Sequence, residues 1–443
     1  MMHRLIIALG CTAFGCVLAA SCTSSRRSTL SARPEVMNVS EMPREFSLPD
    51  DFFPIMTWEL APRSNEFSDQ KHGLQSVLDC GFTLIGFARP ADLAQCEKLG
   101  MKAIVAAEDR LRNWRELSDQ QIENIIERWV KETHSSKAVI GYFLMDEPGV
   151  RDFPALGKAV AAVKKFAPGK LAYINLYPDY ATLGAPDLSQ LGTKSYDEYL
   201  ERFVREVRPQ IISYDNYRVQ YSNDMTDANP AAGYYANLLT VRRVAQAHDL
   251  PFWNIVSSNQ IRKTTPPPSP ANMLFQAYTT LAAGASGLTW YTYYGGGYHY
   301  AAVEKSGSRT ASWSYLKMTN DQVKVLGPIM RQLKSTGVYF TSPAAPSLPA
   351  LPGKLVQAIQ SDAPIMIGEF SGPRDAKYVM LVNGSLQRSA KVNLTLTNKS
   401  KIVHISPVDG SESPLEEENS LWLGAGQGAL LRYVAATPAS PSR

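Results

Sequence analysis

Two adjacent carboxylates, Asp146 and Glu147, end an apolar run that begins at Val139, and Pro148-Gly149 follows them directly. The run is rich in β-branched and aromatic residues, which indicates a strand buried on both faces. The Pro-Gly pair turns the chain away. A buried strand has no structural need for two acids at its end. A proton donor beside a second carboxylate is, however, the pair that hydrolysis of a glycosidic bond requires.

Glu147 is the candidate general acid, because aromatic neighbours around its pocket would raise its pKa towards neutral pH. There are two candidates for the second group. Asp146 is adjacent in sequence, whereas Asp215 lies in S-Y-D-N-Y at the end of another apolar run. A purely structural use, in which Asp146 caps the loop and Asp215 pairs with an Arg, is the competing interpretation. The residues alone leave the choice of partner open.

The elements that must position these acids are short apolar runs that alternate with helix-like segments. Eight such runs cover residues 53–59, 81–87, 101–106, 139–147, 171–177, 210–217, 252–257 and 287–294. This alternation is typical of βα units. Eight of them predict a (β/α)8 TIM barrel, in which catalytic side chains project from the C-terminal ends of the strands. An open doubly wound sheet is the alternative, but no G-x-G-x-x-G follows the first run.

Other strand ends predict a lining for the same cavity. Its candidate substrate-binding residues are Trp58, Glu59, Asn175, Tyr177, Tyr214, Tyr217, Asn254, Trp290, Tyr293 and His299. Aromatic faces stack on sugar C–H surfaces, and amides and carboxylates bind hydroxyls in fixed directions. Single Tyr and Trp residues commonly fill barrel layers, but the set as a whole favours a carbohydrate pocket.

The N-terminus, residues 1–22, is predicted to be a lipoprotein signal peptide. A basic Arg4 precedes an apolar segment that ends in A-A-S-C, and this ending resembles a lipobox in which Cys22 becomes lipidated. Cys16 is a weaker competing site, and a plain secretory signal is the alternative. Residues 23–46 read as a flexible tether. We therefore expect an exported protein held in the cell envelope by a lipid anchor, on the periplasmic side or at the cell surface.

The predicted barrel covers residues 47–341, after which the composition changes. Residues 342–352 are a Pro- and Ser-rich linker, residues 353–436 alternate as strands of a small all-β sandwich, and residues 437–443 read as a disordered tail. The chain of 443 residues carries a net charge of only +4, which argues against nucleic acid as the main partner. No Cys/His spacing predicts a metal site, and no cofactor is expected. Cys80 and Cys96 are left as either a disulfide or two buried thiols.

Three motifs, F-L-M-D-E-P-G, I-N-L-Y-P and S-Y-D-N-Y, together with an aromatic eighth strand and a C-terminal sandwich, resemble glycoside-hydrolase-like barrel proteins. The layout is similar to the clan A enzymes, including the family 42 β-galactosidase type, whose acid/base Glu ends strand four. Glu147 matches that position. Those enzymes also carry a nucleophilic Glu at the end of strand seven, and this chain reads N-I-V-S-S-N-Q there. The adjacent Asp-Glu pair resembles hexosaminidase-type families 20 and 123 instead, in which the Asp orients a substrate N-acetyl group.

The resemblance implies a glycoside hydrolase that acts on an oligosaccharide or polysaccharide, and the predicted lipid anchor would hold it at a membrane. Glu147 would be the general acid/base, with Asp146 or Asp215 as its partner. The alternative is a non-catalytic carbohydrate-binding barrel lipoprotein, which the missing acid after strand seven favours. The sequence sets neither the sugar nor the oligomeric state.

Overall fold

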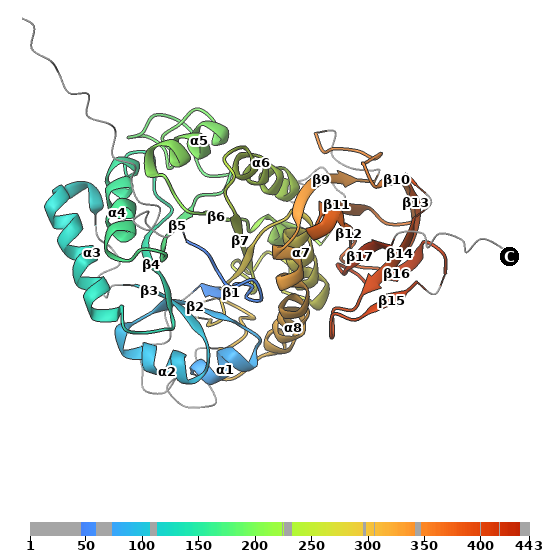
Figure 1. Ribbon diagram of the computed structural model, residues 1–443, viewed down its shortest axis with the longest axis horizontal. Coiled ribbons are helices and arrows are strands. Elements are labelled where there is room, and N and C mark those ends of the chain that lie inside the picture. Colours follow the sequence, from blue (N-terminus) through green and yellow to red (C-terminus); the bar gives the residue numbers. More distant parts are fainter. Residues whose placement is uncertain are drawn as a thin grey trace, which may run out of the picture. The chain divides into compact units, whose positions relative to one another are not determined.

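The computed structural model describes residues 46–58, 73–106, 113–223, 225, 233–295, 298–304, 306–341, 347–398, 400–415 and 417–434. Eight parallel strands close into a barrel in the order of the sequence (Figure 1). They are β1 (Ile55–Trp58), β2 (Leu84–Ala88), β3 (Lys102–Val105), β4 (Val139–Asp146), β5 (Leu171–Leu176), β6 (Ile212–Asp215), β7 (Phe252–Ser257) and β8 (Gly287–Tyr291). Each corresponds to one predicted run, so the predicted (β/α)8 barrel is confirmed.

The helices form a ring outside the strands (Figure 1). They are α1 (Leu74–Asp79), α2 (Leu93–Lys98), α3 (Asp119–Thr133), α4 (Phe153–Phe166), α5 (Tyr196–Val207), α6 (Gly233–Ala247), α7 (Pro270–Ala282) and α8 (Ala311–Arg331), with short 3-10 turns η3 (Pro90–Asp92), η4 (Trp114–Glu116), η5 (Arg218–Tyr221) and η7 (Pro373–Asp375). Helix α3 begins with a reciprocal capping box between Ser118 and Gln121. Its buried stripe of Ile122, Ile125 and Trp129 follows the predicted helical spacing.

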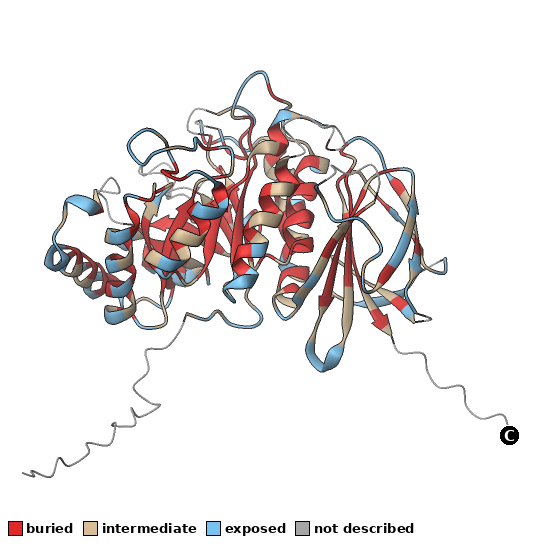
Figure 2. Ribbon diagram, turned by 90° about the horizontal axis from the view of Figure 1, so that it is seen from above, coloured by how far each residue is buried: buried red, intermediate tan, exposed pale blue. Residues whose placement is uncertain are grey.

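Two apolar layers hold the barrel. The interior is filled by side chains that include a run of aromatic rings, with Phe87 and Phe143 centred 4.0 Å apart and Tyr173 and Trp253 5.8 Å apart. Alternate residues on the same strands, such as Tyr142 on β4, pack outward against the helices. Figure 2 shows buried residues concentrated on the strands and on the inner sides of the helices. The candidate site therefore lies above an aromatic floor.

Two antiparallel sheets follow the barrel and enclose a second apolar core, as the predicted sandwich requires. One has the order β15-β14-β17-β12-β11-β9 and the other β10-β13-β16. The strands are β9 (Lys334–Phe340), β10 (Val356–Ser361), β11 (Ile365–Ser371), β12 (Lys377–Asn383), β13 (Ala390–Leu396), β14 (Lys401–Ile405), β15 (Glu412–Pro414), β16 (Ser420–Leu423) and β17 (Gly428–Val434).

One boundary differs from the prediction. The sequence predicts residues 334–341 as part of the barrel, but β9 pairs antiparallel with β11 along the edge of the larger sheet. Helix α8 ends at Arg331, so the sheet begins almost at once. The polar start of β9, K-S-T-G, hides it from sequence analysis, because an edge strand needs only one apolar face. Residues 342–346 of the predicted linker lie outside the described residues.

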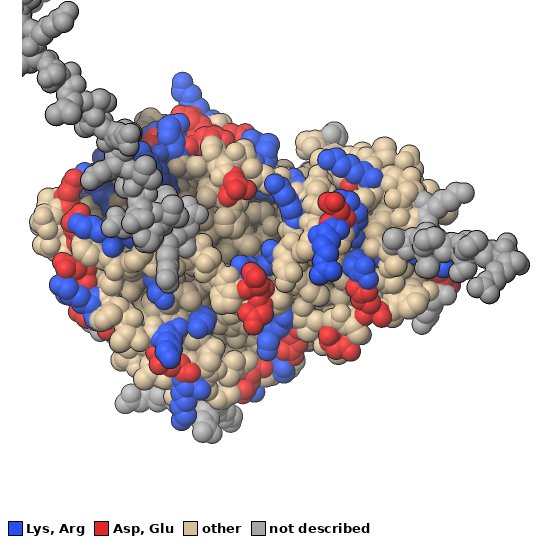
Figure 3. Space-filling model, in the orientation of Figure 1, with Lys and Arg blue, Asp and Glu red and all other residues tan. Residues whose placement is uncertain are grey.

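Other predictions concern parts of the chain with separate outcomes. Cys80 and Cys96 are both buried free thiols, so of the two alternatives the thiols are confirmed. The signal peptide, Cys22, residues 23–45 of the tether and the tail lie outside the described residues. Across the described ranges, no helix combines the length and apolarity needed to cross a membrane. On the face drawn in Figure 3, acidic and basic side chains are interspersed. Ion pairs such as Lys165–Glu123, at 2.9 Å, join neighbouring helices.

Helix α7 joins the barrel to the larger sheet. Every residue from 272 to 282 is buried, and the helix contacts β11, β12 and β17 on its outer side. Gly368 on β11 allows a close approach, because a Cβ there would overlap the carbonyl oxygen of Ala282. Gly428 on β17 similarly accommodates the ring of Tyr278.

Replacing Gly368 with Ala therefore tests this contact. We expect the variant to lose about 1 to 3 kcal/mol of stability, because the added methyl must displace backbone atoms. The measurement is the shift of the urea unfolding midpoint of the purified protein. Ala358→Val, which adds carbon at an exposed position of β10, is the control and should change stability by less than about 0.5 kcal/mol. Equal midpoints for Gly368→Ala and the wild type would contradict close packing here.

Candidate active site

A β-bulge in β4 orients the first carboxylate. Phe143 pairs with Tyr173 on β5, but Asp146 pairs with Asn175, so β4 uses one residue more than β5 over this step. Phe143 and Tyr173 both face the barrel interior. Without the extra residue, Met145 would lie opposite Asn175 and Asp146 would face the helices. The bulge therefore turns Asp146 into the barrel mouth.

Two further contacts fix the backbone around this bulge. The indole Nε1 of Trp114, a residue only 1% exposed, donates to the carbonyl oxygen of Leu144 at 2.9 Å. Glu147 then adopts a φ of 46°, in the left-handed region. For a non-glycine residue this conformation costs on the order of 1 kcal/mol and is common at functional sites. The Glu147 amide donates to the carbonyl oxygen of Asn175 at 2.8 Å, which holds the turn in place.

One amide side chain connects two of the three carboxylates. The Nδ2 of Asn175 donates to Asp146 Oδ1 at 3.0 Å and also to Asp215 Oδ1. Its Oδ1 accepts from the Ser213 hydroxyl at 3.2 Å, and the Tyr173 hydroxyl lies 2.8 Å from the same Ser213 oxygen. Because both ends of the amide are engaged, its orientation is defined. Hydrogen bonds through Tyr173, Ser213 and Asn175 thus connect the barrel interior to the two acids.

The third carboxylate, Glu147, is hydrogen-bonded to Asp215. Two carboxyl groups share such a bond only when one holds a proton. Burial, reinforced by the negative charge of Asp146, raises the pKa of Glu147 to about 7. Burial and the charges of Asp146 and Glu147 raise the pKa of Asp215 well above its ordinary value. Asp215 therefore keeps its proton to a higher pH than an ordinary Asp does.

The three acids differ in their contact with solvent. Asp146 is exposed, Glu147 is partly buried, and Asp215 is only 6% exposed. No Lys or Arg of the described chain contributes to the pKa of Glu147, so it is not held in a structural ion pair with one. The site therefore offers one solvent-facing carboxylate and one acid that titrates near neutral pH. A buried acid stands behind them.

Tyrosines surround this group. The rings of Tyr217 and Tyr291 are centred 5.2 Å apart, and the hydroxyls of Tyr291 and Tyr298 lie 2.6 Å apart. After burial, the charges of Asp215 and Asp146 are the largest causes that raise the pKa of Tyr217, so this ring lies close to the acids. The pKa of Tyr177 is likewise raised, first by burial and then by the charge of Glu147. The rings form an aromatic wall beside the carboxylates.

Some predicted lining residues lie at this mouth and others do not. Trp58, Asn175, Tyr177 and Tyr217 lie there, with Trp58 partly exposed above Phe87. Four others point away from it. Tyr214 is buried with Tyr196 and Tyr234 between strands and helices, Asn254 donates to Thr280 on α7, Trp290 donates to Asn320 on α8, and the Tyr293 hydroxyl meets Ser76 on α1. The proposed binding roles of those four residues are corrected accordingly.

The errors follow from strand alternation. Neighbouring residues on a strand face opposite sides, so a choice that is one residue off selects the outer layer. On β8 the mouth-facing residue is Tyr291 and not Trp290, and on β6 Ser213 and Asp215 face inward while Tyr214 faces out. Strict alternation from Asp215 would have identified Ser213. Nothing in the sequence marks Trp114.

Two predicted residues remain to be placed. His299 is exposed, and its backbone bridges to Gln260. Glu59 lies outside the described residues. Among the described residues, no group of His, Cys, Asp and Glu has an arrangement that could hold a metal ion.

Comparison with solved structures reports the same fold. A catalytic mutant of a family 42 β-galactosidase from G. stearothermophilus aligns with a TM-score of 0.59 over 86% of this chain and 98% of that chain, at 8% identity. A family 5 glycoside hydrolase from Bacteroides vulgatus gives 0.53 over 89% and 93%, at 11% identity. An Anoxybacillus α-amylase gives 0.52 over 88% and 100%, at 10% identity.

At these identities the likeness establishes the fold, and the predicted layout of a glycoside-hydrolase-like barrel with C-terminal strands is confirmed. No family model matches this sequence. No curated protein matches it either.

The raised pKa of Glu147 has a consequence for stability. Its ordinary value is 4.5, so between about pH 4.5 and 7 the folded protein binds more protons than the unfolded chain. The contribution of Glu147 to the free energy of unfolding therefore falls as the pH rises through this window. Glu147→Gln removes this effect, and at pH 8 the variant should be more stable than the wild type by on the order of 1 to 2 kcal/mol.

The measurement is urea unfolding at pH 4, 6 and 8. At pH 4 the variant and wild type should differ little, and Glu132→Gln on the exposed side of α3 should follow the wild type at every pH. Parallel stability curves for Glu147→Gln and the wild type would show that Glu147 is not a buried, titrating acid.

Proposed function

We propose that the protein is a glycoside hydrolase that uses Glu147 as general acid/base. The observation that carries this proposal is the hydrogen-bonded pair of Glu147 and Asp215 beside the solvent-facing Asp146 at the barrel mouth. A leaving-group oxygen must receive a proton at near-neutral pH, and an acid whose pKa is about 7 is suited to supply it.

Asp146 is the proposed second catalytic group. It is the exposed member of the cluster, and the Asn175 amide fixes its position. A carboxylate in that place stabilises positive charge at the anomeric carbon or orients a substrate group that attacks it. The end of β7, Ser257-Ser258-Asn259, carries no acid that competes for this role.

Asp215 is the proposed positioning residue for Glu147. Pairs of catalytic carboxyl groups are separated by about 5 to 5.5 Å in retaining glycosidases and by about 6.5 to 9.5 Å in inverting ones. A direct hydrogen bond brings the two carboxyl groups closer than either spacing. Asp215 is therefore suited to hold Glu147, and the nearly complete burial of its side chain favours the same role.

The proposed substrate is an oligosaccharide or polysaccharide. The wall of Tyr217, Tyr291 and Tyr298 offers faces on which sugar rings stack, with hydroxyls at their edges. The solved neighbours also support this class, since the family 42, family 5 and α-amylase structures are all named as carbohydrate-cleaving enzymes. Because these names differ in substrate, they do not select a sugar or linkage.

A second candidate function is a carbohydrate-binding barrel without catalysis. The observation in its favour is the absence of an acid at the end of β7, the position of the nucleophile in the family 42 layout. The two functions differ in one outcome: a binding protein gives no turnover, and its affinity for sugars is unchanged when Glu147 is replaced.

The activity prediction concerns Glu147→Gln. We expect at least about 100-fold lower turnover, because Gln cannot donate a proton, with the fold retained. The assay is a panel of chromogenic glycosides, N-acetylated ones included. Wild-type turnover should fall as the pH rises above about 7, because the acid must be protonated. Glu132→Gln is the control. Near-normal turnover of Glu147→Gln would exclude it as the acid.

We also propose that the protein is exported and anchored through a lipid on Cys22. The basic start, the apolar segment and the A-A-S-C ending support this. A single acyl chain binds a membrane only weakly, but a diacylglyceryl group on Cys22 would carry two chains. Two chains are enough for stable anchoring.

Metabolic labelling with radioactive palmitate in a bacterial host tests the anchor. The wild type should be labelled and should fractionate with membranes, whereas Cys22→Ser should lose the label. Cys16→Ser is the matched control for the competing site and should keep it. Undiminished labelling of Cys22→Ser would move the anchor elsewhere.

A further inference from the structure

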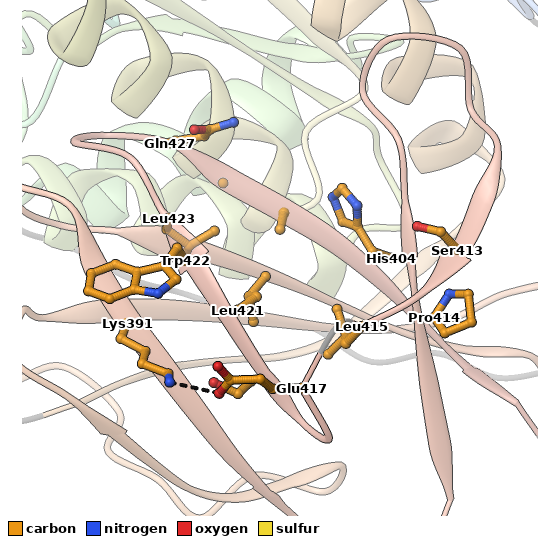
Figure 4. Close-up of a pocket in the computed structure, with 13 residues that line it drawn as sticks. Lys391, His404, Ser413, Pro414, Leu415, Glu417, Leu421, Trp422, Leu423 and Gln427 are labelled. Carbon is orange, nitrogen blue, oxygen red and sulfur yellow. Dashed lines mark ion pairs between the residues drawn. The ribbon is translucent and has the colours of Figure 1, made fainter.

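A pocket with a volume of about 330 Å³ lies in the C-terminal sheets, away from the barrel mouth (Figure 4). It opens where β16, an edge strand of the smaller sheet, faces β14, β15 and β17 of the larger one. Its lining residues are Lys391, His404, Ser413, Pro414, Leu415, Glu417, Ser420, Leu421, Trp422, Leu423, Gln427, Gly428 and Ala429. The volume is within the range of small-ligand sites.

Trp422 is the outstanding feature of this pocket. Its side chain is 67% exposed, although a Trp normally contributes its large apolar surface to a core. Trp422 lies on β16, and the residue opposite it on β13 is Lys391. The Lys391 ammonium forms an ion pair with Glu417 at 2.7 Å. Figure 4 shows the Trp422 ring beside Lys391, with Lys391 reaching to Glu417. The indole face is thus presented to solvent next to fixed polar groups.

The pocket has no net charge to offer a ligand. The charges of Lys391 and Glu417 cancel within their ion pair. Burial lowers the pKa of His404 below its ordinary value, so the ring is neutral at pH 7. None of the other lining residues ionises near neutral pH. A charged ligand would find no unpaired partner here, so the complementary ligand is uncharged.

The remaining polar groups are hydroxyls and an amide. Ser420 is only 7% exposed, and its hydroxyl lies near the Glu417 carboxylate without a hydrogen bond of standard geometry to any described residue. Ser413 and the Gln427 amide also line the pocket and add donors and acceptors. A buried hydroxyl without a well-formed partner is costly unless something binds it. Together with the indole face, these groups suit a ligand that is apolar on one side and hydroxylated at its edge.

We propose that this pocket is a second carbohydrate site, which binds a neutral glycan chain by stacking a sugar ring on Trp422. Sugar rings present C–H faces to an aromatic plane and hydroxyls to the groups around it. The site would hold a polymer without cleaving it. It depends on residues of β13 to β17 only, so it stands independently of the chemistry at Glu147.

Affinity gel electrophoresis tests this proposal with hydroxyethyl cellulose, xylan, galactan, soluble starch and the acidic polygalacturonate as probes. The protein carries Glu147→Gln, so that no polymer is cut during the run. We expect retardation by at least one neutral polymer. Trp422→Ala should weaken that binding about 5- to 10-fold, because one stacking contact is lost. Trp422→Phe, which keeps a ring, should stay within about 3-fold.

Val408→Ala is the matched control, since Val408 is 82% exposed in the turn between β14 and β15 and does not line the pocket. It should bind like the parent. Retardation by none of the neutral polymers overturns the proposal, as does retardation by polygalacturonate alone. Unchanged binding by Trp422→Ala also overturns it, because any retention then belongs to another surface. Each of these outcomes leaves the turnover assay of Glu147 unaffected.

Discussion

The structure of the candidate site depends on a single amide. Asn175 divides its two N–H bonds between Asp146 and Asp215, and its oxygen is occupied by Ser213. Without that amide, Asp146 and Asp215 would both lose the N–H donor that they share. The negative charge of Asp146 also raises the pKa of Asp215. Glu147 adds a third acid, which is accommodated because Asp215 retains a proton. The cluster is therefore a proton-sharing group and not a set of separate ions.

The backbone of β4 delivers the acids to this amide. One extra residue between Phe143 and Asp146 reverses the side on which the last side chain emerges, and Trp114 satisfies the carbonyl freed there. The left-handed turn at Glu147 then directs its carboxyl group towards Asp215. Below them the aromatic rings of the barrel interior exclude water. Burial is accordingly the largest cause of the raised pKa of Glu147.

The barrel could be predicted from the sequence alone, because each strand is a separate apolar run between helices with regular spacing. The sequence also identified Asp146, Glu147 and Asp215 as candidates, since acids at the ends of buried runs are conspicuous. It could not decide which neighbours face the mouth. Trp290 and Tyr291 are both aromatic, and only the register of β8 separates them. The β4 bulge is invisible for the same reason, because it is a relation between two strands.

Helix α7 has no solvent-exposed side between residues 272 and 282. The outer side of a barrel helix is ordinarily exposed to solvent. In α7, however, residues 272–282 are all buried, because the barrel covers the inner side and β11, β12 and β17 of the larger sheet cover the outer side. Separating the barrel from the C-terminal sheets would expose the apolar surface of α7 to solvent. We therefore expect the barrel and the C-terminal sheets to unfold together in one cooperative transition, because β11, β12 and β17 cover the outer side of α7.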